Sequence, residues 1–297
     1  MATYRRCWVI GAGAVVSVIA AALHKSDRIK THLVGQSPHA VQVGKKGLVL
    51  DIDGQGSTSV DLNAVPAGDV PSLLGDDLVL LTGKVPALGE TLSWLGPRCS
   101  PKTGIIALQN GLGPEEMISN ALNRPVDRGL VFFGATSPSP GKGRYFPGAI
   151  RLRPSPVTTC LCRLLEGSII QCDVTENFRD MAWFKLAINC VANPLAGILA
   201  ASNPQIAEPV LDPAKESILD EVLKVALAEG ATVDLTVHDI NGYLIHENTP
   251  SMRTDIVRGK ATEIEVINGA VVRLGQKHGI PTPANSLLTG MIRYLER

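Results

Sequence analysis

The beginning of the chain strongly limits the folds that it can adopt. Cys7–Ile10 is a short apolar run, Gly11-Ala12-Gly13 follows it, and Ala14–Leu23 continues as an apolar, alanine-rich segment. This order predicts a strand, a glycine turn and a helix, which together place backbone N–H groups and a positive helix end against a pyrophosphate. A tight turn without a ligand is the alternative, because Val16 replaces the third glycine of the GxGxxG pattern.

The second predicted strand favours NADP over NAD. Thr31–Val34 ends in Gly35-Gln36-Ser37, where an NAD-binding unit would carry an acid for the ribose hydroxyls. His39, Lys45 and Lys46 lie just beyond, so we expect a 2'-phosphate to be tolerated. Solvation of these side chains without a phosphate is the alternative.

Two polar side chains follow later predicted strands. Lys84 comes after the strand 78–82, and Asn110 lies in the turn Gln109-Asn110-Gly111 after the strand 104–108. Ligands of open α/β sheets bind at the carboxyl ends of strands, so both residues are candidate ligand contacts. Ordinary turn chemistry explains Asn110-Gly111 equally well.

The remaining segments of the first half complete this prediction. We expect strands at 47–50 and 59–62, antiparallel strands between Arg128 and Arg153, a helix at 156–166, a strand at 167–172 and a linker at 173–177. After Glu176 strand patterns almost disappear, and helical spacing predicts helices at 212–229, around 238–246, from Ser251 onward past Glu263, and from Thr282 to Tyr294. The fold class is therefore α/β. A Rossmann-type dinucleotide-binding domain (residues 1–175) precedes an all-α domain (residues 176–297).

The segment Trp183–Asn203 combines apolar residues with a polar stripe. In a helix, Lys185, Asn189 and Asn193 lie four residues apart and project along one face. Pro194 follows and should kink or break the helix. The amine and amides would need partners in a cleft with a ligand or water, or in a neighbouring loop.

Composition excludes several classes of protein. The 28 basic and 28 acidic residues balance, so the chain lacks the excess positive charge that is typical of nucleic-acid-binding proteins. The six cysteines lack zinc-ligand spacing, which predicts no metal site and reduced thiols in a cytoplasmic protein. No stretch of 18 uninterrupted apolar residues occurs, so we expect no membrane span.

With these residues in hand, the whole chain resembles the ketopantoate reductase family (2-dehydropantoate 2-reductases). The resemblance rests on WFKLAINCVANPLA at 183–196, ENTPSMRTDI at 247–256, TEIEVING at 262–269 and HGIPTPAN at 278–285, together with the N-terminal glycine turn and Gln109-Asn110-Gly111. The order and separation of these motifs also fit.

The resemblance implies NADPH-dependent reduction of 2-dehydropantoate to pantoate in pantothenate biosynthesis. Lys185 is similar to the general acid, and Glu263 to the acid beside it and the cofactor. The implied substrate contacts are Asn110, Asn189, Asn193, Asn248 and Ser251. The implied cofactor contacts are Gly11, Ala12, Gly13, Ala14, Val15, Val16, Gln36, Lys84, Asn110 and Glu263. The apolar helical half is also compatible with a homodimer.

Three departures from the family pattern keep alternatives open. Val16 stands at the third glycine, Gln36 stands where arginine is usual, and Thr136-Ser137-Pro138 replaces Thr-Thr-His. The last change predicts a looser loop over the active site. The alternatives are a reductase of another branched 2-oxo acid and a protein that senses NADP(H) without turnover.

Overall fold

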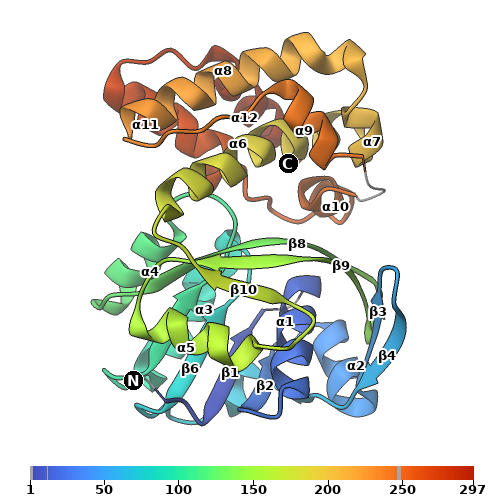
Figure 1. The fold of residues 1–297 in the computed structure, drawn as a ribbon, viewed down its shortest axis with the longest axis vertical. Coiled ribbons are helices and arrows are strands. Elements are labelled where there is room, and N and C mark those ends of the chain that lie inside the picture. Colours follow the sequence, from blue (N-terminus) through green and yellow to red (C-terminus); the bar gives the residue numbers. More distant parts are fainter. Residues whose placement is uncertain (1–2, 12, 246–248) are drawn as a thin grey trace. The chain divides into compact units, whose positions relative to one another are not determined.

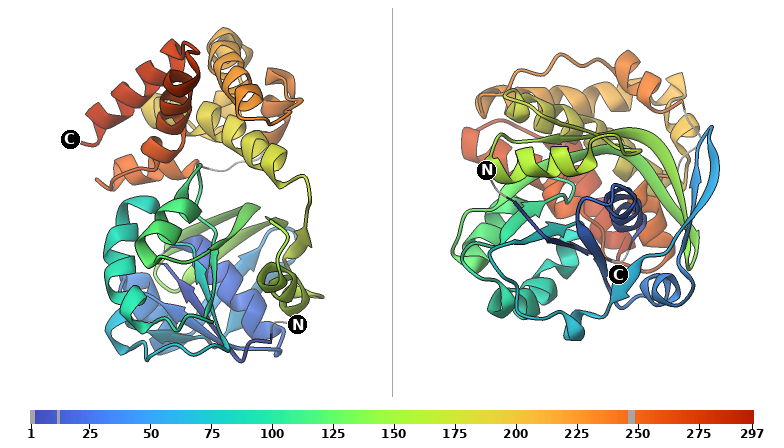
Figure 2. Two further views of the ribbon diagram at one scale, coloured as in Figure 1. Left: turned by 90° about the vertical axis from the view of Figure 1, so that its left-hand side faces the viewer. Right: turned by 60° about the horizontal axis from the view of Figure 1, so that its bottom comes forward.

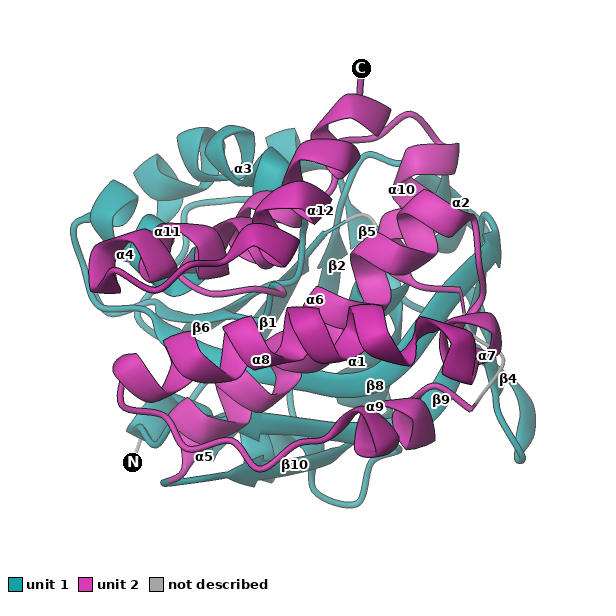
Figure 3. Ribbon diagram, turned by 90° about the horizontal axis from the view of Figure 1, so that it is seen from above, with its two compact units in different colours: residues 1–109, 114–176 teal, residues 110–113, 177–297 magenta. Residues whose placement is uncertain are grey.

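The computed structural model describes residues 3–11, 13–245 and 249–297, and the chain divides into two compact units. Unit 1 comprises residues 1–109 and 114–176, and unit 2 comprises residues 110–113 and 177–297 (Figure 3). The short segment Asn110–Gly113 therefore belongs to unit 2 although unit 1 flanks it on both sides.

Unit 1 contains a ten-stranded sheet whose parallel part has the strand order of a Rossmann fold. The parallel strands run β5-β2-β1-β6-β7, and β8 joins them beside β7. Their bounds are β1 (Arg6–Ile10), β2 (Lys30–Val34), β5 (Asn63–Val65), β6 (Asp77–Leu81), β7 (Gly104–Ala107) and β8 (Asp127–Ser139). The predicted α/β class is confirmed. The three-residue strand β5 was not predicted, because it is too short for an apolar pattern.

Both faces of this sheet are covered by helices. Alternate residues of β1 point to opposite sides, so that Cys7 and Val9 join one core while Trp8 and Ile10 join another. The first core receives α1 (Ala14–Lys25), α2 (Pro38–Lys46) and α5 (Pro156–Leu165), and the second receives α3 (Leu88–Leu95) and α4 (Pro114–Leu122). Short 3-10 helices η1 (Ala67–Asp69), η2 (Val85–Ala87) and η3 (Gly96–Arg98) complete the connections.

The sheet continues beyond β8 as a curved extension. β8 pairs antiparallel with β9 (Lys142–Leu152), β9 pairs parallel with β3 (Leu48–Ile52) and β10 (Gln171–Val174), and β3 forms a hairpin with β4 (Gly56–Val60). The long strands β8 and β9 lie over α1 (Figures 1 and 2). The antiparallel extension was predicted, although as several short strands instead of two long ones.

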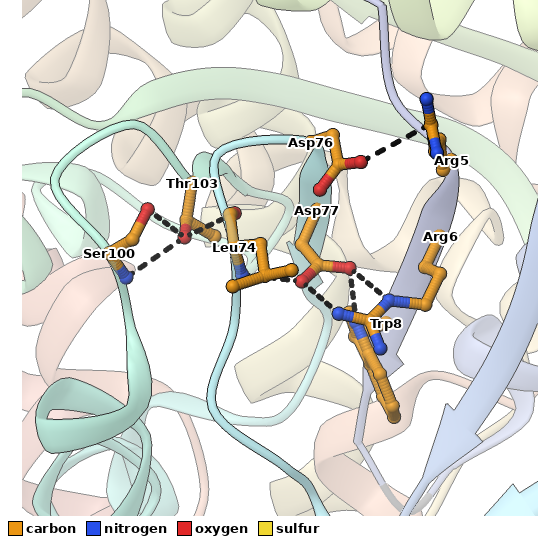
Figure 4. A network of polar contacts seen from close by, with 8 residues as sticks. All are labelled: Arg5, Arg6, Trp8, Leu74, Asp76, Asp77, Ser100 and Thr103. Carbon is orange, nitrogen blue, oxygen red and sulfur yellow. Dashed lines mark hydrogen bonds and ion pairs between the residues drawn. The ribbon is translucent and has the colours of Figure 1, made fainter.

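A buried carboxylate joins the amino-terminal ends of β1 and β6. Asp77 accepts hydrogen bonds from Arg6 Nε (2.7 Å) and Nη2 (2.6 Å), from Trp8 Nε1 (3.1 Å) and from the Leu74 backbone N–H (2.6 Å) (Figure 4). The side chain of Asp77 is fully buried. This network lies at the amino-terminal ends of β1 and β6, whereas the glycine turn follows the carboxyl end of β1.

Unit 2 is helical apart from its connecting segments. Its central helix α6 (Phe178–Leu199) contributes a buried apolar face to the core, which also contains apolar side chains of the other helices. These are α7 (Asn203–Ile206), α8 (Asp212–Ala228), α9 (Val237–Tyr243), α10 (Ser251–Val257), α11 (Asn268–His278) and α12 (Pro283–Leu295), with 3-10 helices η4 (Pro209–Leu211) and η5 (Ile264–Val266). By length and composition α6 is apolar enough to cross a membrane. However, 56% of its most apolar 18-residue stretch is buried inside the structure, as is also found for core helices of soluble proteins.

The prediction that Pro194 could break α6 is wrong, because the helix continues past Pro194 to Leu199. A proline at position 194 cannot donate to the carbonyl of Cys190, four residues earlier. The side chain of Asn268 replaces that donor, with Asn268 Nδ2 2.9 Å from the Cys190 oxygen. The helix therefore keeps this buried carbonyl satisfied.

The prediction of one long helix from Ser251 past Glu263 is also wrong. Helix α10 ends at Val257, Gly259 adopts a positive φ of 59°, and Glu263 precedes the 3-10 helix η5. Gly259 ends the helical run because the left-handed conformation is open to glycine at little cost. Ser251 is the first residue of α10, and Pro250 occupies the N-cap position.

Candidate active site

The glycine turn of unit 1 lies where three strand ends converge. A Cβ atom on Gly11 would approach Thr82 Oγ1 to 2.5 Å, and one on Gly35 would approach the Gly11 oxygen to 2.8 Å. The backbone N–H groups of Thr82 and Gly83 both donate to the Ile10 oxygen, at 2.9 and 3.1 Å. The carboxyl ends of β1, β2 and β6 thus pack closely here, with glycine at Gly11 and Gly35 where a larger residue would clash, as in a dinucleotide-binding turn.

The amino end of α1 fits an anionic group. Gly13 is the N-cap and is exposed, no side chain caps the helix, and its first turn carries no acidic residue. A Cβ at Gly13 would meet no described atom within 4 Å. The first N–H groups of α1 are therefore arranged as in a phosphate-binding turn.

Val16 does not disturb this turn. Its side chain is 1% exposed and lies in the core between α1 and the sheet. Ala14 and Val15 are half-buried in the first turn of the same helix. The larger side chain at the position of the third glycine therefore fits into the core between α1 and the sheet.

His39 does not supply the positive charge expected near a 2'-phosphate. The ring is buried, and burial lowers the pKa of His39. Gly141 N–H donates to Nδ1 at 3.3 Å, and Nε2 lies 2.7 Å from Ser17 Oγ. His39 thus links α2 to α1 and to the β8–β9 turn as a neutral ring.

Of the other residues expected near the adenosine ribose, Gln36 lies close to the end of β2, whereas Lys45 and Lys46 do not. Gln36 is exposed directly after β2, and Ser37 caps α2 by accepting from Ala40 N–H at 3.2 Å. Lys45 and Lys46 lie in the last turn of α2, about 10 Å along the helix from its start. They are therefore placed away from the end of β2.

Lys84 and the Thr136-Ser137-Pro138 segment are the remaining predicted site features of unit 1. Lys84 is half-buried and follows β6 at the N-cap of η2. Residues 136–138 belong to β8, and Ser137 Oγ lies 3.0 Å from His39 Nδ1. The segment is therefore the irregular end of β8 and not a loop, because Thr136 pairs with Arg144 whereas Ser137 and Pro138 lie at a register shift between β8 and β9.

The predicted catalytic residues of unit 2 are joined by one amide. Lys185 Nζ donates to Asn110 Oδ1 at 3.0 Å, and Asn110 Nδ2 donates to Glu263 Oε2 at 3.1 Å. Because the ammonium can only donate and the carboxylate only accepts, these contacts fix the orientation of the amide. The chain Lys185–Asn110–Glu263 brings together residues from three distant segments.

Backbone contacts hold Asn110 in this position. Leu112 N–H donates to the Val266 oxygen at 2.9 Å, and Gly111 has a φ of 84°. A Cβ on Gly111 would approach the Val266 oxygen to 2.3 Å, so only glycine fits here. The Asn-Gly dipeptide in the sequence was the signal for this turn, but its partner η5 could not be found from sequence.

The polar stripe of α6 is present as predicted from the spacing. Lys185, Asn189 and Asn193 lie at successive four-residue steps of one continuous helix, which places them about 6 Å apart along its axis. Asn189 is half-buried and Asn193 is buried. Ser251 is exposed at the start of α10. Asn248 and Ala12 lie outside the described residues.

Several polar residues within the family-like motifs have structural partners that sequence analysis missed. Asn268 Nδ2 also donates to Asn285 Oδ1 at 2.9 Å, and Asn285 Nδ2 donates to Glu221 Oε2 at 2.8 Å. Glu221 in turn accepts from the backbone N–H groups of Ala284 and Asn285 at the start of α12. These side chains connect α8, α11 and α12.

Two family sequence models cover most of the chain. The model described as ketopantoate reductase PanE/ApbA matches residues 7–153, and the model of its C-terminal domain matches residues 177–296. A 2-dehydropantoate 2-reductase of Pyrococcus horikoshii is 29% identical over 98% of this chain and 97% of the relative.

Solved structures show the same similarity in three dimensions. A D-mandelate dehydrogenase with NADH and anilino(oxo)acetate matches with a TM-score of 0.87 and 25% identity, over 98% of each chain. A 2-dehydropantoate 2-reductase of Methylococcus capsulatus matches with a TM-score of 0.82 and 26% identity, over 98% of this chain and 96% of the other. Together with the two family models, these similarities show that the chain belongs to the ketopantoate reductase family.

Proposed function

We propose that this protein reduces ketopantoate to pantoate with NADPH. The observation that carries this proposal is the hydrogen-bonded chain Lys185–Asn110–Glu263 in a member of an oxidoreductase family. A bound reduced nicotinamide supplies the hydride. The residues of the chain must then polarise the substrate ketone and protonate the alkoxide that forms.

Lys185 is suited to both tasks. An ammonium stabilises developing negative charge on the ketone oxygen and can transfer a proton to it. Asn110 accepts one N–H of this ammonium, which orients the amine. Glu263 holds the amide of Asn110 in place, which makes it a positioning residue in this scheme.

The remaining predicted residues are proposed as binding contacts. Asn189 and Asn193 offer neutral amides to a hydroxyl and a carboxylate, and Ser251 and Asn248 are further candidates. In unit 1, the turn from Gly11 to Val16 would hold the pyrophosphate, with Gln36 and Lys84 beside the cofactor.

NADPH is proposed over NADH because no acid follows β2 to bind the ribose hydroxyls. Lys45, Lys46 and His39 do not support this preference, because burial lowers the pKa of His39 and the lysines lie at the far end of α2 from the end of β2. The preference therefore rests on Gln36 and its neighbours.

Steady-state assays with a panel of 2-oxo acids test the proposal. We expect NADPH oxidation with ketopantoate to have a kcat/KM at least about 10-fold above that with 3-methyl-2-oxobutanoate, which lacks the hydroxyl that an asparagine would bind. Equal or better kcat/KM with NADH would contradict the cofactor preference alone. Binding of NADPH without turnover of any acid would instead favour a sensing protein.

A reductase of another branched 2-oxo acid is the second candidate. The similarity to D-mandelate dehydrogenase is as close in structure as that to the reductases, and its bound cofactor is NADH. Faster turnover of 2-oxo-2-phenylacetate than of ketopantoate in the same panel would favour this candidate.

We further propose a cytoplasmic protein, active as a homodimer, without nucleic-acid or membrane partners. The balanced charge supports the absence of a nucleic-acid partner, and the burial of α6 supports the absence of a membrane partner. Light scattering of the purified protein measures the oligomeric state directly.

A further inference from the structure

Two cysteines of unit 1 lie much closer than their sequence positions suggest. Cys162 is on α5 and Cys172 is on β10, and their sulfur atoms are 2.8 Å apart. Both residues are free thiols and both are half-buried. A disulfide bond is about 2.05 Å long, so bond formation needs a movement of less than about 1 Å.

The neighbouring cysteine does not share this position. Cys160 lies two residues before Cys162 on α5, and residues two apart on a helix point to nearly opposite sides. Burial raises the pKa of Cys160, and a hydrogen bond with the backbone of Tyr4, which precedes β1, opposes this effect. The pair is therefore specific to Cys162 and Cys172.

A metal site does not explain the pair. Among the described residues, no group of three or more histidine, cysteine, aspartate or glutamate side chains could hold a metal ion. A dithiol with two sulfur donors falls short of the four ligands of a structural zinc site.

The surroundings favour Cys162 as the nucleophile. The hydrogen bond with Cys172 lowers the pKa of Cys162, and the positive charge of Arg151 on β9 acts in the same direction against the effect of burial. The hydrogen bond with Cys162 and burial raise the pKa of Cys172, which remains a thiol. Arg151 also forms an ion pair with Asp173, the residue after Cys172. Reactive cysteines occur at partly exposed positions beside a basic side chain.

We propose that Cys162 and Cys172 form a reversible dithiol–disulfide site that is oxidised by hydrogen peroxide. The Cys162 sulfur attacks a peroxide oxygen, the O–O bond breaks, and a sulfenic acid forms as one water leaves. The Cys172 sulfur then attacks the sulfenic sulfur, the S–O bond breaks, and a second water leaves. Two thiols and one hydrogen peroxide thus give one disulfide and two waters.

The bond would close a short loop in a defined part of the fold. It would connect α5 to β10, the last strand before α6. A disulfide restricts the unfolded chain, so the oxidised protein should have a higher Tm that returns to its original value with dithiothreitol. This inference does not depend on the proposed reductase function, because its readouts are covalent structure and stability.

Peptide mapping after oxidation tests the site. The full-length protein is treated with a small excess of hydrogen peroxide, alkylated and digested with trypsin. Cleavage after Arg163 places Cys162 in the peptide 152–163 and Cys172 in the peptide 164–179. We expect these two peptides to be joined, with a mass lower than their sum by two hydrogen atoms, and to separate after reduction.

Matched variants identify the sulfur atoms. Cys162→Ser and Cys172→Ser should each abolish the joined peptide, whereas Cys160→Ser should retain it. Persistence of the bridge in Cys162→Ser would overturn the assignment to that residue. Separate alkylation of both thiols, after peroxide treatment that oxidises the methionines, would overturn the proposal as a whole.

Discussion

At the scale of single residues, the ammonium of Lys185 is the group on which the proposed chemistry depends. Lys185→Ala should lower kcat on the order of 100- to 10,000-fold, because the alkoxide loses its proton donor. Affinity for NADPH should change little, since the proposed phosphate contacts belong to unit 1. Stopped-flow or steady-state turnover and fluorescence titration of NADPH measure the two quantities.

Lys224 provides a matched control for that substitution. It lies on α8 with a side chain that is 60% exposed and pairs with Asp220. Lys224→Ala removes the same charge and should leave kcat unchanged. A kcat within a few-fold of the parent in Lys185→Ala would show that another group donates the proton.

Asp77 makes the stability of unit 1 dependent on pH. Burial alone would raise the pKa of Asp77, but hydrogen bonds from Arg6, the Leu74 N–H and Trp8 outweigh it and the pKa is lowered. A carboxyl with a lower pKa in the folded state stabilises the protein above the unfolded pKa of about 3.9 and loses this contribution as pH falls through the folded value. Asp77→Asn should therefore destabilise the protein at pH 7 by about 1–3 kcal/mol.

Urea unfolding of both proteins at neutral and acidic pH measures this effect. The difference in free energy of unfolding should shrink once the pH falls below about 4. Asp76→Asn is the control, because Asp76 is partly exposed and its ion pair with Arg5 should contribute little. A difference that is constant with pH would show that the charge of Asp77 does not carry the stability.

At the scale of secondary-structure elements, α6 continues through Pro194 because Asn268 binds the Cys190 carbonyl. Asn268→Ala should lower the free energy of unfolding by about 1–3 kcal/mol, since buried polar groups lose their partner. In a Pro194→Ala background the new N–H at position 194 can donate to the same carbonyl. The cost of Asn268→Ala should then be smaller by at least about 0.5 kcal/mol.

A double-mutant cycle by chemical denaturation provides this comparison. Asn285→Ala is the control, because Asn285 contacts Asn268 and Glu221 but not Cys190. Its cost should be the same with proline or alanine at position 194. Strict additivity of Pro194→Ala and Asn268→Ala would contradict the proposed replacement of the helix donor.

Elements were predictable from sequence where local pattern decides their structure. The strand, glycine turn and helix at the N-terminus and the four-residue spacing of Lys185, Asn189 and Asn193 are local properties, and both are present. The fate of α6 at Pro194 was not predictable, because it depends on Asn268, seventy-four residues later. The break after α10 was missed although Gly259 offered a local signal.

At the scale of the whole molecule, the class of fold followed from the change from strand to helix patterns near residue 176. The hydrogen-bonded contact between Asn110 and Lys185 could not be derived in the same way. Residues 110–113 follow a strand of unit 1, and only the structure shows that they pack with unit 2. Similarly, the proximity of Cys162 and Cys172 requires α5 and β10 to be placed side by side.

The membership of Asn110–Gly113 in unit 2 has a consequence for recombination between relatives. A hybrid enzyme joined only at residue 176 would take Lys185 and Glu263 from one parent and the bridging Asn110 from the other. Its segment 110–113 would also have to fit a foreign η5, where Gly111 leaves no room for a side chain against Val266. Functional hybrids should therefore take residues 110–113 and residues 177–297 from the same parent. Such a hybrid needs one crossover before residue 110, one after residue 113 and a third at the linker before residue 177.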